Sequence, residues 1–165
     1  MNAIYLCMAV LLAGIPNGPR VCELADEVLD AADIMSVAPA LIVAIGHHES
    51  RWTPTVVNPK SGACGLFQQI PRWSPYNCRE LMDPPTAFDG LILTWKWLER
   101  WPRIGGSIPE MLCGYSAGPK YCRVWPRGTS YSRTVERIAG GVIFAERLLT
   151  GGRGLEARES FSGGL

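Results

Sequence analysis

The chain has few charged side chains, few histidines and no hydrophobic run long enough to cross a membrane. Charged residues make up 19% of its 165 residues and apolar ones 47%, a balance that excludes intrinsic disorder and supplies one buried core. It has two histidines and no Cys-x-x-Cys pair, which argues against a zinc site. A net charge of +1 gives no field that draws the chain to nucleic acid. We therefore expect one domain without metal, cofactor or nucleic-acid partner.

The charge is unevenly distributed along the chain. Residues 1–50 hold six acidic side chains and one basic one, a balance of −5, so the remainder carries +6. A weakly basic remainder suits an anionic, wall-like polymer, and a solvated surface explains the same count.

Six cysteines are many for this length, and they allow 15 pairing schemes. Cys64 and Cys78 bracket a proline-rich stretch, and Cys113 and Cys122 are close enough to close a short loop. Such pairs are typical of an oxidising setting, which predicts a periplasmic or extracytoplasmic location, with a virion as a further option.

Residues 1–20 contain an apolar run, Ile4–Ile15, of about the length of a signal-peptide core. No Lys or Arg precedes it, and Pro16–Pro19 is a loop rather than an obvious cleavage site. Two interpretations stay open: an export signal or weak anchor, and a buried N-terminal helix. Removal of this run would take Cys7 with it and leave one of the other five cysteines unpaired.

The rest of the pattern is helical. Apolar spacing predicts helices over 23–35, 39–49, 86–101 and 132–149, and Ser107-Ile108-Pro109-Glu110 has the form of another helix start. Six prolines make residues 52–85 loops and short turns, where a site would lie. No repeat or alternating strand pattern occurs. The sequence thus predicts a mainly α domain over 21–150, followed by a Gly/Ser-rich, flexible tail over 151–165.

Glu49 stands out on physical grounds. It lies four, seven and eight residues after Ile45, Ile42 and Leu41, so on a helix it shares their apolar stripe. Removal of a carboxyl group from water raises its pKa, and a carboxylic acid that is protonated near neutral pH can act as a general acid. The alternative is an acid at a fraying helix end that turns into water.

Three ordered motifs favour the first interpretation. Glu49-Ser50 is followed by the segment Ser61-Gly62-Ala63-Cys64-Gly65-Leu66-Phe67-Gln68, and later by Tyr115-Ser116-Ala117-Gly118. In order and spacing, residues 21–150 resemble the soluble lytic transglycosylase family and its goose-type lysozyme relatives. The resemblance implies a lysozyme-like fold, in which a loop-rich segment forms a saccharide cleft, and peptidoglycan glycan strands as the substrate.

The resemblance also implies residue roles. Glu49 matches the family's catalytic acid, and Ser61 and Gln68 match its substrate-contacting positions. Tyr115 matches a tyrosine that hydrogen-bonds near the acid or the substrate. Ser116 stands where the family usually has Asn, so an amide hydrogen bond is lost or shortened there. Gly62 and Gly65 permit turns and the close approach of a sugar to the backbone.

Aromatic side chains divide into two predicted groups. Trp52, Trp73 and Trp125 are candidates for stacking on sugar rings. A helical spacing places Trp95, Trp97 and Trp101 in the core instead.

The reaction type depends on a second carboxylate. Glycosidases that add water need one, and the first acid after Glu49 is Glu80. A single acid favours the transglycosylase route to 1,6-anhydro ends over a muramidase, although Asp83 or Asp89 could still fold into the cleft. A catalytically silent wall-binding module is a further alternative. A metal site on His47-His48-Glu49 is disfavoured because adjacent helical residues point about 100° apart. A role in a phage or a secretion apparatus is an open expectation.

Overall fold

The computed structural model describes residues 1–101, 106–122 and 126–151, and of residues 126–129 only the backbone. Over these residues the chain is helical, and its only strand-like pairs are the isolated bridges Val57–Cys64 and Cys64–Gln69. The elements run in this order: α1 (Ala3–Leu12), α2 (Gly18–Glu23), α3 (Ala25–Met35), α4 (Pro39–Ser50), the short 3-10 helix η1 (Pro71–Trp73), α5 (Cys78–Leu81), α6 (Pro84–Glu99), α7 (Ile108–Ala117) and α8 (Pro126–Leu149).

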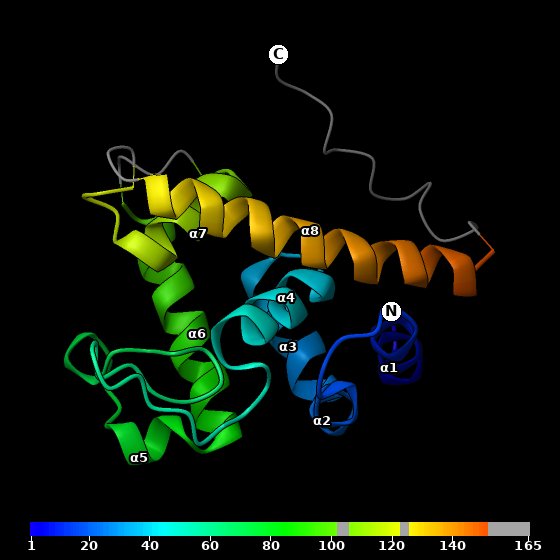
Figure 1. The fold of residues 1–165 in the computed structure, drawn as a ribbon, viewed down its shortest axis with the longest axis horizontal. Coiled ribbons are helices and arrows are strands. Elements are labelled where there is room, and N and C mark those ends of the chain that lie inside the picture. Colours follow the sequence, from blue (N-terminus) through cyan, green and yellow to red (C-terminus); the bar gives the residue numbers. More distant parts are fainter. Residues whose placement is uncertain (102–105, 123–125, 152–165) are drawn as a thin grey trace.

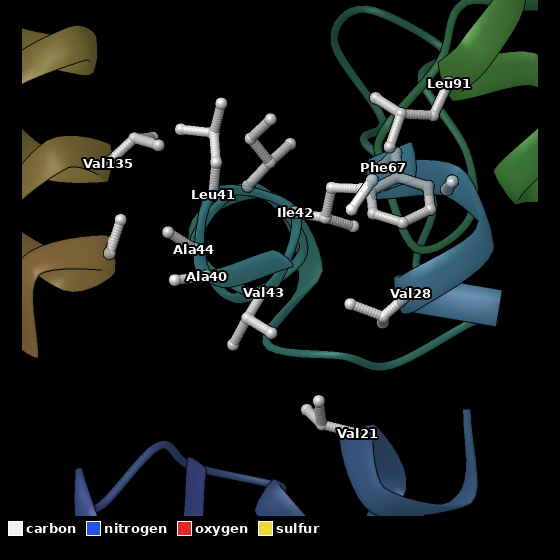
Figure 2. Close-up of a cluster of buried hydrophobic side chains, with 14 of the residues drawn as sticks. Val21, Val28, Ala40, Leu41, Ile42, Val43, Ala44, Phe67, Leu91 and Val135 are labelled. Carbon is white, nitrogen blue, oxygen red and sulfur yellow. The ribbon is translucent and has the colours of Figure 1, made fainter. Parts of the chain in front are cut away.

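Helix α4 is the centre of the core. Every residue from Ala40 to Gly46 is buried, because other elements surround the helix. Figure 2 shows Val135 of α8 on one side of α4, Val21 of α2 and Val28 of α3 on others, and Phe67 and Leu91 beyond Ile42. A helix that is apolar on all sides is buried on all sides. The acid at its end is therefore held by the most firmly packed element of the domain.

The predicted helices match the observed ones closely. The predicted helix 23–35 is α3, which begins two residues later, at Ala25. The main difference is α2, which was not predicted: Gly18 and Pro19, which we expected in a loop, form its first turn. Helix α8 starts six residues before the predicted position and runs across one side of the domain (Figure 1). The mainly α, lysozyme-like fold class is confirmed. The predicted flexible tail lies outside the described residues, apart from Gly151.

The N-terminal run forms α1, which lies beside the C-terminal half of α8 (Figure 1). Leu6, Ala9 and Val10 are completely buried. Burial raises the pKa of Glu146 on α8, and the amino group of Met1 opposes this rise. This packing is that of a buried helix, whereas a role of the segment in export stays a prediction.

Three disulfides join all six cysteines: Cys7–Cys22, Cys64–Cys78 and Cys113–Cys122. The second and third are the pairs that we expected from the proline-rich stretch between Cys64 and Cys78 and from the closeness of Cys113 and Cys122. The first ties α1 to α2, so Cys7 has a partner that lies beyond the apolar run.

Among the described helices, none alone is long and apolar enough to span a membrane. Helices α3 and α4 have the required length and composition only together, and a bend of 114° separates them.

The chain turns back sharply where α4 ends. Arg51 and Trp52 both have left-handed backbone angles, with φ of 52° and 60°, which non-glycine residues adopt at a cost of order 1–2 kcal/mol. The amide groups of both residues donate to the last turn of α4. The indole of Trp52 then packs under Gly46 and donates to the Val43 carbonyl at 3.1 Å. A side chain at position 46 would collide with this indole.

Two glycines fix the segment that follows. Gly65 has φ +78°, and a Cβ there would overlap the carbonyl of Leu81. Gly90 on α6 leaves room for the buried amide of Gln69, whose oxygen a Cβ at position 90 would overlap. The close neighbours of these backbones are thus other parts of the chain. This is a correction for Gly65, for which we expected a sugar.

Candidate active site

Glu49 is the second-last residue of α4, and it is partly buried. Its Oε1 atom accepts a hydrogen bond from the hydroxyl of Tyr131 at 2.6 Å. Burial raises the pKa of Glu49 from 4.5 to about 7, and the bond from Tyr131 opposes part of this rise. Glu49 therefore stays partly protonated near neutral pH, as a general acid requires.

Tyr131 comes from the first half of α8 and is 8% exposed. The edge of its ring meets the ring of His48, with centroids 4.6 Å apart and planes at 70°. On another side it stacks with Tyr115 of α7, with centroids 6.4 Å apart and planes at 29°. Two neighbouring rings thus fix the direction in which its hydroxyl points.

Tyr131 is a site residue that the sequence pattern does not predict. The predicted last helix begins at Ser132, one residue after it. The signal was present, because Tyr131 lies four residues before Val135 and eight before Ala139, on the stripe that faces the core. A tyrosine on such a stripe has a hydroxyl that needs a partner, but the spacing does not say that Glu49 supplies it.

Tyr115 lies next to this pair, as its matched position implies. Its hydroxyl donates to the carbonyl of Phe67 at 2.6 Å, so it ties α7 to the loop that carries the Ser-Gly-Ala motif. Burial, and then the Glu49 carboxylate, raise the pKa of both Tyr115 and Tyr131 well above the ordinary value. Both phenols therefore keep their protons at any pH at which the protein works.

Gln68 lies in the same loop with φ of 48°. Its amide nitrogen donates to the carbonyls of Val56 and Gly65, at 3.0 and 3.1 Å. The nitrogen thus closes the loop on itself.

The two predicted serines are exposed. The hydroxyl of Ser61 accepts from the backbone of Ala63 at 3.2 Å, and that of Ser116 donates to the Cys113 carbonyl within α7 at 3.2 Å. Both bonds are local, and neither serine is hydrogen-bonded to Glu49 or Tyr131. Of the predicted contact residues, the structure brings Tyr115 next to these two.

The tryptophans divide differently from the prediction. Trp52 is 1% exposed and packs against Phe67 and Phe88, so its predicted contact with sugar is wrong. Trp97 is 50% exposed because it points off the buried face of α6, so its predicted place in the core is also wrong. Trp95 is in the core, as predicted, and Trp101 is partly buried against the core, with its ring next to that of Trp97. Trp73 is exposed, and Trp125 lies outside the described residues.

The two histidines before Glu49 have lowered pKa values. Burial lowers the pKa of both His47 and His48; Arg51 lowers the first further, and His47 the second. Neutral imidazoles add no positive charge beside Glu49 that would stabilise its carboxylate. No cluster of three metal-binding side chains occurs among the described residues.

Other carboxylates do not contribute to the site. Asp83 and Asp89 are exposed, and Glu80 closes the capping box at the start of α5. None of these is among the groups that shift the pKa of Glu49. In the described part of the chain, the site is one carboxyl group with two phenols.

The fold, a helical domain with Glu49 at the end of its central helix, is of the lysozyme-like class. Within that class the chain belongs to the transglycosylase SLT domain family, whose model matches residues 27–136. No curated protein matches this chain in sequence.

The fold is similar to that of the 70 kDa soluble lytic transglycosylase from Escherichia coli, with a TM-score of 0.51 and 19% sequence identity. The match covers 90% of this chain and 30% of that protein, so this chain corresponds to less than a third of its length.

Proposed function

We propose that the chain is a peptidoglycan lytic transglycosylase, which cuts the β-1,4 bond between N-acetylmuramic acid and N-acetylglucosamine. The observation that carries this proposal is Glu49, a lone acid whose pKa of about 7 suits it both to give and to take a proton. Membership of the transglycosylase family supports the choice of substrate.

The reaction needs one acid and no water. Protonated Glu49 gives its proton to the glycosidic oxygen as the bond from that oxygen to C1 breaks, and the substrate's N-acetyl oxygen stabilises C1. The Glu49 carboxylate then takes the proton of the 6-hydroxyl, and O6 bonds to C1. The products are a free 4-hydroxyl and a 1,6-anhydro ring, and Glu49 has its proton back.

The surrounding residues support this cycle. Tyr131 stabilises the carboxylate that exists between the two proton transfers, because a hydrogen bond to the charged form favours it. Tyr115 holds the loop that carries Gln68 in place. We propose Gln68, Ser61, Ser116 and Tyr115 as the residues that contact the glycan strand.

The absence of a second carboxylate from the groups that act on Glu49 favours the lyase over the hydrolase. Three disulfides among the described residues support an extracytoplasmic location. Work in the periplasm, at a virion or in a secretion apparatus remains part of the proposal.

Mass spectrometry of purified peptidoglycan after digestion tests the product. A lytic transglycosylase leaves anhydro ends, which are lighter by one water than the reducing ends that a muramidase leaves. Reducing ends would replace the lyase by the hydrolase. Binding to the wall without any released fragment would instead indicate a silent module.

A further inference from the structure

The N-terminal residues lie outside the family match, which begins at residue 27, and yet they contact both elements that form the site. Helix α1 packs on α8, which carries Tyr131. The loop between α1 and α2 reaches the end of α4, just beyond Glu49. The N-terminal segment thus contacts the helix that carries Tyr131, away from Tyr131 itself, and the end of the helix that carries Glu49.

Asn17 makes the contact with α4. It stands at the N-cap of α2, where Asn usually accepts a hydrogen bond from its own helix, but its side chain makes no such bond. Its amide nitrogen donates instead to the carbonyl of Arg51 at 2.7 Å. The left-handed backbone of Asn17, with φ of 60°, is one that Asn tolerates better than most residues.

Arg51 is the place where such a bond matters. It is the left-handed C-cap of α4 and lies two residues after Glu49. The carbonyls at a helix end lack partners within the helix, and Asn17 supplies one from a segment 34 residues away. This bond opposes unwinding of the turn that positions the acid.

The Cys7–Cys22 disulfide holds this contact in place. It closes the loop that contains Asn17, while Leu6, Ala9 and Val10 bury the other side of α1. Removal of residues 1–20 would leave Cys22 without its partner and the Arg51 carbonyl without its donor.

We infer that residues 1–24 are a permanent part of the folded protein and that Asn17 is a positioning residue, which holds the end of α4 and hence Glu49. The positioning role of Asn17 rests on the proposed function, because activity measures it. The retention of residues 1–24 does not.

Peptide mapping tests whether residues 1–24 are retained and joined through Cys7 and Cys22. The full chain is recovered from expressing cells with its thiols blocked, and its peptides are analysed without reduction. We expect a peptide pair joined by Cys7 and Cys22 in a chain that still contains α1. A mature chain that starts after residue 20, with a blocked Cys22, would overturn the inference.

Two variants of Asn17 test its positioning role. Asn17→Asp keeps the size but replaces the donor by an acceptor, and Asn17→Gly fits the left-handed backbone but has no side chain. The loss of one hydrogen bond predicts that kcat falls about threefold to tenfold in both variants, with KM unchanged. Because a looser helix end lets water reach Glu49, the alkaline limb of the pH–rate profile moves to lower pH.

Asn2→Ala is the matched control. Asn2 also makes one side-chain hydrogen bond in this segment, to the amide of Tyr5 at the start of α1. Its loss lowers Tm and leaves kcat at the wild-type value. Wild-type kcat in both Asn17 variants, or an equal loss in Asn2→Ala, would overturn the positioning role. Failure of the proposed function would show itself separately, as full activity in Glu49→Gln.

Discussion

Replacement of Glu49 by Gln changes activity and stability in opposite directions. Gln has nearly the same shape and still accepts the hydrogen bond from Tyr131, but it gives no proton to a leaving oxygen. We expect kcat to fall by about 10² to 10⁴, which is the usual contribution of a general acid. Clearing of a peptidoglycan suspension, followed by its turbidity, measures this loss.

The stability effect follows from the pKa. Because the folded-state pKa of Glu49 lies above its ordinary value of 4.5, at about 7, folding favours the protonated form. The contribution of that form to stability is complete below pH 4.5 and is lost as the pH rises through 7. A difference of this size corresponds to about 3 kcal/mol at most.

Glu49→Gln removes this pH-dependent loss. It should therefore raise the free energy of unfolding at pH 8 by up to about 3 kcal/mol, or Tm by roughly 5–10 °C, and change little at pH 4. Thermal denaturation at both pH values measures the effect. Glu136→Gln, at an exposed site on α8, is the matched control and should change neither Tm nor clearing. Wild-type clearing by Glu49→Gln, or an equal Tm change at both pH values, would refute the reasoning.

Three further changes test the surroundings of the acid. Tyr131→Phe removes the bond that lowers the pKa of Glu49, so the alkaline limb of kcat/KM should move to higher pH; an unchanged limb would contradict this. Gly65→Ala forces a clash with the Leu81 backbone and should lower the free energy of unfolding by more than 2 kcal/mol. Gly62→Ala, with similar φ but open space, should cost only about 1 kcal/mol, and equal losses in urea would refute the clash. Replacement of both Cys64 and Cys78 by alanine should lower the free energy of unfolding by about 3 kcal/mol. Wild-type denaturation curves that coincide with and without reductant would contradict this.

The sequence predicted the helices because their apolar spacing is local information. The stripe that ends at Glu49 gave the position of the acid and the direction of its pKa shift. The pairing of Tyr131 with Glu49 could not be predicted because the two residues lie 82 positions apart, and spacing within one helix says nothing about contacts over that distance. Trp52 was misjudged for a similar reason, since its burial depends on the space that Gly46 leaves under it.

The N-terminal run shows where composition is ambiguous. A signal-peptide core and a buried helix both need apolar residues, so Leu6 and Val10 satisfy either interpretation. Our inference that this run stays in the folded protein rests on the partner of Cys7 and on the contact of Asn17 with Arg51, and both are tertiary.

The fit between Gln69 and Gly90 restricts the order in which the sequence can change. A side chain at position 90 overlaps the buried amide of Gln69, so a larger residue there requires that amide to move while Gln69 is present. Once position 69 holds a smaller residue, the same change at position 90 meets no such overlap. The two positions are therefore epistatic, and mutational paths that begin at position 69 avoid a collision that paths beginning at position 90 must first relieve.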